Sequence, residues 1–147
     1  MTGLIHSAGP GSGDAPRVAF DASGNAIAIW AQGSSLSNIW SNRYTAGVGW
    51  GTAVQIENNS AGSAALPQVA VYPAGDAVAV WYQFNGASYD VWVNRYKLGA
   101  GWGTPALLET LAGHALRPQI AVGAVGAVAV WDQFDGTRIS IWASEYR

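Results

Sequence analysis

Short apolar segments alternate with turn residues along the whole chain, and helix is expected to be nearly absent. In the first third, Val, Ile and aromatic residues concentrate at 16–20, 25–31, 38–44 and 53–57. Gly, Asn, Asp and Ser fill the intervals, which is the pattern of short strands joined by tight turns. The segment 25–31 alternates Ala with Ile, small with large, instead of apolar with polar. A strand with one solvated face would carry polar residues there, so both faces of this strand are predicted to be buried.

The same strand pattern occurs three times along the chain, the third time without its fourth strand. It begins at Pro16, Pro67 and Pro118, which are 51 residues apart. The tryptophans keep the same register in the repeats, which indicates that each has a fixed place in a repeated structure. They are Trp30, Trp81 and Trp131; Trp40, Trp92 and Trp142; and Trp50 and Trp102.

Four-stranded units that repeat at this period and are covered on both faces by copies of themselves are typical of β-propeller blades. A β-solenoid would have shorter coils, and an immunoglobulin sandwich would not repeat in this way. We therefore predict an all-β fold, a β-propeller with three blades in one chain. Residues 16–66 and 67–117 form the first two blades, 118–147 supply three strands of the third, and 1–15 supply a fourth strand and a linker.

Three blades are too few to close a ring, because propellers generally have four to eight. Residues 4–6 align with residues 55–57 at the repeat spacing, so the chain opens with a fourth strand and ends after a third strand. We expect the N-terminal strand to complete the last blade in trans, in a two-fold homodimer of six blades without exposed sheet edges. The alternative is a piece of a longer array, in which neighbouring repeats fill the ring.

The net charge of the chain limits the kinds of partner that it is expected to bind. Seven basic and nine acidic residues give a net charge of −2, which provides no basic face for nucleic acid or for an anionic membrane. No apolar run is long enough to span a bilayer, and the first residues do not read as a signal peptide. The absence of cysteine excludes disulfides and thiol catalysis, but the compartment stays unknown.

The sequence does not predict an enzyme. His6 and His114 lack the spacing of metal ligands, and no Gly-x-Ser-x-Gly elbow is present. Asp132 and Asp135 are close in sequence but do not form a calcium-binding loop. Most acidic residues fall in predicted turns, where aspartate favours the backbone conformation, and none forms an evident glycosidase pair. We therefore expect no catalytic residue, no metal and no cofactor.

Repeated polar residues favour recognition through several weak sites instead, because linked weak sites reinforce one another. Trp50 and Trp102 stand in glycine-flanked loops, where an aromatic ring can stack on a sugar. Each candidate also has a structural interpretation: the tryptophans can plug a blade edge, the arginines can pair with glutamates, and the glutamines can satisfy turn backbone. The candidate ligand-binding residues are Trp50, Trp102, Arg43, Arg95, Glu57, Glu109, Gln83 and Gln133.

The motifs at 67–71, 75–81, 91–96 and 101–104 resemble a tandem repeat of bacterial proteins, often surface or secreted, that are predicted propellers without an assigned activity. The Gly-x-Gly-Trp turns are more distantly similar to those of bacterial and fungal propeller lectins, including fucose-binding lectins assembled from short oligomerising chains. Those lectins typically hold a sugar between blades with Trp or Tyr, Arg and Glu. The resemblance implies a secreted or surface location and glycan binding. A purely structural, self-assembling repeat, natural or engineered, is the alternative.

Overall fold

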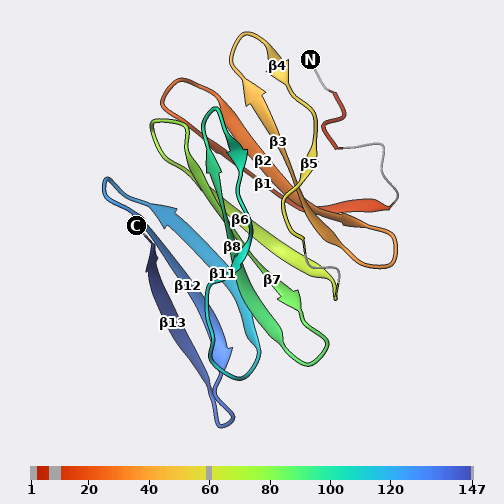
Figure 1. Ribbon diagram of the computed structural model, residues 1–147, viewed down its shortest axis with the longest axis vertical. Coiled ribbons are helices and arrows are strands. Elements are labelled where there is room, and N and C mark those ends of the chain that lie inside the picture. The colour runs from red at the N-terminus through yellow and green to blue at the C-terminus, as the bar shows by residue number, and fades with distance from the viewer. Residues whose placement is uncertain (1–2, 7–10, 59–60, 147) are drawn as a thin grey trace.

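The computed structural model describes residues 3–6, 11–58 and 61–146 (Figure 1). These residues form an all-β structure of three antiparallel sheets that lie side by side, with the described termini at opposite ends of the row. The described part of the chain contains no helix, and therefore none that could cross a membrane.

The first sheet has five strands: β1 (Ser12–Phe20), β2 (Ala26–Gly33), β3 (Asn38–Thr45), β4 (Gly49–Trp50) and β5 (Val54–Gln55). Strands β1 to β4 follow one another in order, and β5 also pairs with β3. In place of the single fourth strand predicted at 53–57, two short strands, β4 and β5, both pair with β3. Between them, the Gly51 N–H donates a hydrogen bond of 2.8 Å to the Arg43 carbonyl.

The second sheet repeats this arrangement and the third repeats its first three strands. The second contains β6 (Ala64–Val71), β7 (Ala77–Phe84), β8 (Tyr89–Lys97), β9 (Gly101–Trp102) and β10 (Ala106–Leu107). The third contains β11 (Ala115–Val122), β12 (Ala127–Phe134) and β13 (Ile139–Tyr146). The sheets therefore have five, five and three strands instead of four in each complete unit, because the outer strand is interrupted.

The first strand of each sheet carries a bulge that the sequence did not reveal. In β1, Ala15 and Pro16 lie opposite the single residue Trp30, since Asp14 pairs with Ala31 and Arg17 with Ile29. Proline has no N–H to give to the ladder, so a bulge is where a strand tolerates it. Strand β1 consequently continues through the bulge to Ser12, and residues 12–15, expected in a linker, extend the sheet. The residue before the proline has positive φ in all three sheets: Ala15, Leu66 and Arg117.

The alternation of small and large residues is explained by the packing of successive sheets. We call the face with the alanines of the second strand the front face of each sheet, and the opposite one the back face. Ile27 and Ile29 on the back face of the first sheet form one buried cluster with Ala77, Ala79 and Trp81 on the front face of the second. Val78 and Val80 of the second sheet pack in the same way against Ala127, Ala129 and Trp131 of the third. Both faces of β2 are buried, as the alternation indicates.

Candidate functional site

A groove with a volume of about 390 Å³ lies between the first and second sheets. The back face of the first sheet contributes Ile27 and Arg43, and the second sheet contributes Tyr96 and Trp102. Arg43 and Trp102 are both sequence candidates, and the packing of the two sheets brings them to one groove. The other lining residues are Ser41, Asn42, Thr52, Val54, Gln55 and Gly101.

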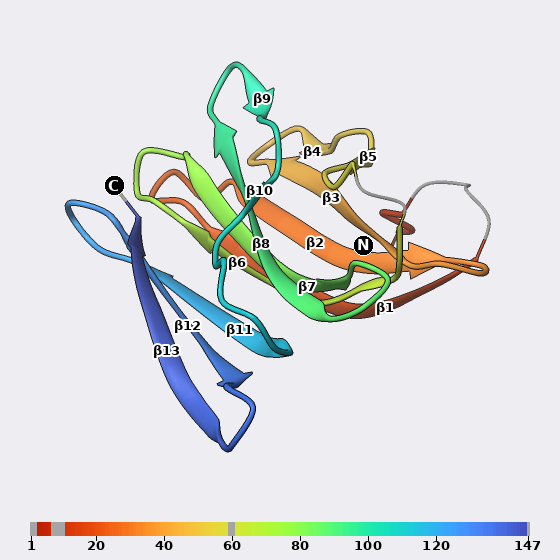
Figure 2. The same ribbon diagram turned by 60° about the horizontal axis from the view of Figure 1, so that its bottom comes forward.

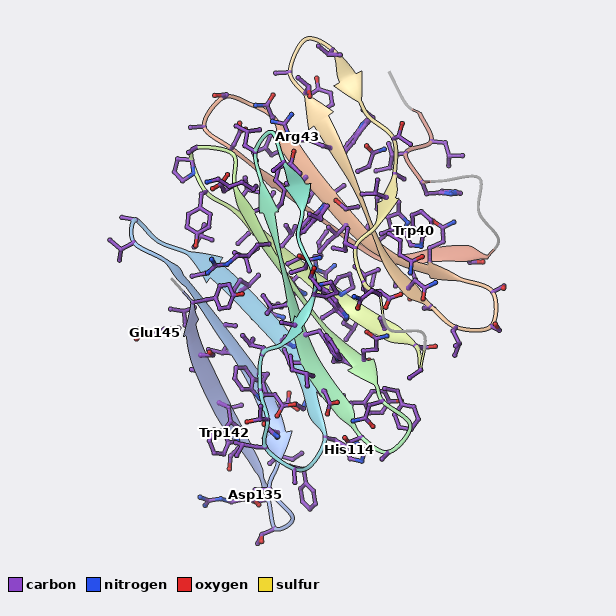
Figure 3. All side chains as sticks on the ribbon, in the orientation of Figure 1. Trp40, Arg43, His114, Asp135, Trp142 and Glu145 are labelled. Atoms are coloured by element: carbon purple, nitrogen blue, oxygen red, sulfur yellow. The ribbon has the colours of Figure 1, made fainter. Side chains whose placement is uncertain are left out.

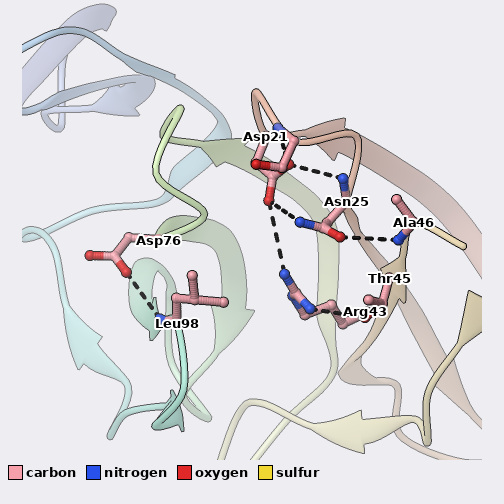
Figure 4. Close-up of polar contacts among 8 residues, drawn as sticks. Asp21, Asn25, Arg43, Thr45, Ala46, Asp76 and Leu98 are labelled. Atoms are coloured by element: carbon pink, nitrogen blue, oxygen red, sulfur yellow. Dashed lines mark hydrogen bonds and ion pairs between the residues drawn. The ribbon is translucent and has the colours of Figure 1, made fainter. Parts of the chain in front are cut away.

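Arg43 is held in place by its own sheet (Figure 4). Its Nη1 donates a hydrogen bond of 3.0 Å to Thr45 Oγ1, and its Nη2 lies 3.9 Å from Asp21 Oδ2. Asn25 donates to the Asp21 carboxylate at 2.7 Å, and this hydrogen bond is the main reason that the pKa of Asp21 is lowered. Asp21 is therefore ionised at neutral pH and orients the guanidinium. A guanidinium has five N–H donors, so Arg43 can still donate to a ligand.

Trp102 and Trp50 have the same local geometry but different surroundings. Trp102 stands edge-on to Tyr96, with ring centroids 5.5 Å apart, and Trp50 stands edge-on to Tyr44 at 5.6 Å. Trp102 is partly buried where the two sheets meet. Trp50 is 41% exposed, on the front face of the first sheet. Within the described chain, only the Trp102 position thus belongs to a groove between two sheets.

Arg95 is the equivalent of Arg43 in the second sheet, and it contacts the third sheet. Its guanidinium carbon lies 3.8 Å from the centroid of the Tyr146 ring, a cation–π contact. A smaller groove of about 270 Å³ lies beside Arg95 and is lined by the second sheet alone, by Tyr72, Asp76, Arg95, Lys97 and three neighbours, none of which is tryptophan. Lys97 Nζ lies 2.6 Å from Asp76 Oδ2, so the pKa of Asp76 is lowered mainly by this hydrogen bond.

The remaining candidates lie in the interior and form two equivalent relays between sheets. Trp81 Nε1 donates to Gln83 Oε1 at 3.2 Å, and Gln83 Nε2 donates to Glu57 Oε2 at 3.3 Å and to the Gly62 carbonyl at 3.2 Å. Because Glu57 follows the last strand of the first sheet, the relay ties the Trp81 indole of the second sheet to the first.

The second relay joins the third sheet to the second in the same way. Trp131 Nε1 donates to Gln133 Oε1 at 3.0 Å, and Gln133 Nε2 donates to Glu109 Oε2 at 3.2 Å and to the Leu111 carbonyl at 3.0 Å. Burial raises the pKa of the Glu109 carboxyl. Both glutamates and both glutamines are buried. The structure brings them together as two Gln–Glu pairs, which do not line the groove of Trp102 and Arg43.

Asn42 lines the groove and was not among the sequence candidates. Its Nδ2 donates to the carbonyls of Ile5 and Gly51 at 2.9 and 3.0 Å, and Asn94 binds Ile56 and Gly103 equivalently at 2.8 and 3.0 Å. The Oδ1 atoms of both asparagines are buried without a hydrogen-bond partner among the described residues. The repeated sequence Asn-Arg-Tyr at 42–44 and 94–96 is the feature by which these asparagines could have been identified.

Comparison with known proteins assigns no activity to this arrangement. No protein-family model matches the chain, and no curated protein sequence matches it significantly. In the described parts of the chain, no group of three or more His, Asp or Glu side chains is placed to hold a metal ion.

Proposed function

We propose that the chain is a non-catalytic β-propeller unit that recognises carbohydrate in the grooves between neighbouring blades, each sheet being one blade. The packing of the sheets supports the propeller. Strand β6 contacts β1 and β2 of the first sheet and β11 of the third, so the first strands of successive sheets lie next to one another. First strands gathered around one axis, with later strands extending outward, are the arrangement of propeller blades.

The groove between the first and second sheets carries the proposal for sugar binding. A pyranose ring has an apolar face and a rim of hydroxyl groups, so its sites combine an aromatic ring with directed hydrogen-bond donors and acceptors. Trp102 supplies the ring, Arg43 supplies charged donors, and the Gln55 amide can donate or accept. The volume of about 390 Å³ falls in the range of small-molecule sites.

A purely architectural role is the second candidate function, and the two relays favour it. They use four of the eight sequence candidates to hold sheets together: Glu57, Gln83, Glu109 and Gln133. The two functions differ in the groove: recognition requires Trp102 and Arg43 to bind a ligand, whereas an architectural unit requires only that they pack.

A glycan-array screen tests the proposal. The protein should carry a terminal biotin tag, because Lys97 is the only lysine of the chain and lies in the smaller groove, where amine labelling would modify it. We expect binding to one sugar family, lost in Trp50→Ala/Trp102→Ala and weakened in Arg43→Gln.

The control for these variants is Arg138→Gln, which removes an exposed guanidinium in the β12–β13 turn and should bind as the unchanged protein does. Far-ultraviolet circular dichroism verifies that each variant is folded. No binding to any sugar by the folded protein, or equal binding by all variants, would refute carbohydrate recognition at this groove and leave the architectural role.

A further inference from the structure

Each internal interface joins the back face of one sheet to the front face of the next, and the three described sheets leave one copy of each face without a neighbouring sheet. On the front face of the second sheet, Val69 and Val71 pack against the buried cluster that includes Ile27 and Ile29. Ile120 and Val122 do the same on the front face of the third sheet. The repeat thus builds one kind of interface twice.

Among the described residues, the front face of the first sheet is open along β1, although Ala26 and Ala28 of β2 are buried. Val18 and Phe20 pair across the sheet with Ala28 and Ala26, so they occupy the places of Val69 and Val71. They are 58% and 64% exposed. An apolar surface whose repeat equivalents are covered is a candidate interface.

The back face of the third sheet is open as well (Figure 2). Val128 and Val130 occupy the places of Val78 and Val80, which are buried, but they are 47% and 36% exposed. Ile141 on β13 is 76% exposed, whereas its equivalents Ile39 and Val91 are buried. The face is therefore a back face whose covering sheet is absent from the described chain.

The backbone hydrogen bonds of the N-terminal segment also indicate a missing neighbouring sheet. Ile56 bridges two sheets: its N–H donates to the Ile39 carbonyl of the first sheet at 2.9 Å, and its carbonyl accepts from Asn94 of the second. Ile5 already has half of this arrangement, since its carbonyl accepts from Asn42. By the same register, the Ile5 N–H would meet the carbonyl of the residue equivalent to Ile39 in a preceding sheet, and in the third sheet that residue is Ile141.

We propose that a second copy of this chain covers both open faces. The front face of the first sheet in each copy docks on the back face of the third sheet in the other, and the Ile5 N–H donates to the carbonyl of Ile141 of the partner subunit. The inference rests on the propeller architecture proposed above and is independent of sugar binding. Head-to-tail interfaces form a ring when the rotation closes. Two copies give six blades, within the range of known propellers, whereas three would give nine.

Closure also creates a groove that one chain cannot form. Tyr44 and Trp50 occupy the places of Tyr96 and Trp102, and they would meet Glu145 of the partner subunit, which stands where Arg43 stands in the internal groove. Figure 3 shows Glu145 on β13, at the outer edge of the third sheet. The two grooves between subunits therefore present a carboxylate to a ligand in place of a guanidinium.

Sedimentation equilibrium and native mass spectrometry of the 147-residue chain test the proposal. We expect twice the chain mass of 15.3 kDa. A mass equal to one chain at every concentration, a trimer, or an open series of larger species would overturn it. The mass is measured without sugar, so failure here is distinguishable from failure of glycan binding.

Two substitutions identify the faces. Val18→Asp and Val130→Asp should each give monomers, whereas Thr137→Asp, in the β12–β13 turn, should leave the dimer intact, because its repeat equivalents Ser35 and Ala87 stay exposed beside the internal interfaces. Mixing the first two variants should restore a heterodimer, because one of its two interfaces then contains only unchanged faces. Dimers of either variant alone, or no association on mixing, would show that these faces do not form the interface. Circular dichroism verifies that each variant retains the sheet structure.

Discussion

The buried carboxylates of Glu57 and Glu109 occupy equivalent places, yet the structure predicts different responses to replacement by glutamine. Both oxygens of Glu57 accept from side-chain amides: Gln55 Nε2 donates to Oε1 at 2.8 Å and Gln83 Nε2 to Oε2 at 3.3 Å. In Glu57→Gln, one oxygen becomes an NH₂ group that faces a donor, whichever way the amide is turned. A buried polar group left unsatisfied costs about 1–3 kcal/mol, so we expect the free energy of unfolding to fall by about 2 kcal/mol.

Glu109→Gln should carry less of this cost. The N–H of Leu111 at 2.9 Å and Nε2 of Gln133 at 3.2 Å both donate to Oε2, so an amide oxygen in that place keeps both hydrogen bonds, and only the bond from the Val91 N–H can be lost. Burial raises the pKa of Glu109 above its ordinary value of 4.5, so the folded protein holds this proton more tightly than the unfolded chain. The wild-type protein therefore loses stability as the pH rises from 4.5 through the raised pKa. Glu109→Gln lacks this loss, so it should gain on the wild-type protein as the pH rises and should be more stable than Glu57→Gln at neutral pH.

Urea unfolding followed by tryptophan fluorescence measures both effects. All proteins are compared at one concentration, because association contributes to apparent stability. The gain of Glu109→Gln on the wild-type protein should disappear below pH 4.5, where the carboxyl is protonated in both states. Equal losses in the two variants at neutral pH would refute the different hydrogen-bonding roles. An unchanged difference between Glu109→Gln and wild type across the pH range would refute the raised pKa.

Two further predictions concern the asparagine bridges. Asn94→Ala leaves the carbonyls of Ile56 and Gly103 without their side-chain donor and should lower the free energy of unfolding by about 2 kcal/mol in the same urea assay, whereas the exposed Asn58→Ala should change nothing measurable. Ile5→Pro removes the N–H proposed to cross the dimer interface but keeps the carbonyl that Asn42 binds. Two lost hydrogen bonds of about 0.5–1.5 kcal/mol each should raise the dimer dissociation constant roughly 5- to 150-fold in sedimentation equilibrium, relative to Ile5→Ala. Equal dissociation constants for these two variants would contradict the bond.

The sequence predicted the all-β class and the approximate positions of most strands, because side-chain alternation and turn residues are local signals. It missed the bulges, since an extra residue is visible only once pairing is known: Pro16 alone does not show that it shares Trp30 with Ala15. The break in the outer strand was missed for the same reason, because it depends on which residues of β3 face the chain as it returns.

The sequence predicted which residue types form the candidate site better than it predicted which of those residues lie together. Arg43 and Trp102 stand on different sheets, and only the packing of those sheets brings them to one groove. The burial of Glu57 was not foreseen, because a glutamate at the end of a strand is usually solvated, and its partner Gln83 lies in the next sheet. A repeated polar residue indicates a fixed place in the structure, but the sequence does not say whether that place faces solvent or a neighbouring sheet.

The relays have a consequence for how such a chain can lengthen or be divided. Each links the tryptophan of one sheet to a glutamate that follows the last strand of the sheet before it. A cut between sheets therefore separates a buried indole and amide from the carboxylate that completes them, and neither fragment retains a full set of hydrogen bonds. The self-sufficient module is offset from the visible sheet: it begins at Ile56 or Glu57 and runs through the following sheet. Duplication or grafting in this offset frame would keep the tryptophan, glutamine and glutamate of each relay together, whereas sheet-by-sheet recombination would separate them at each junction.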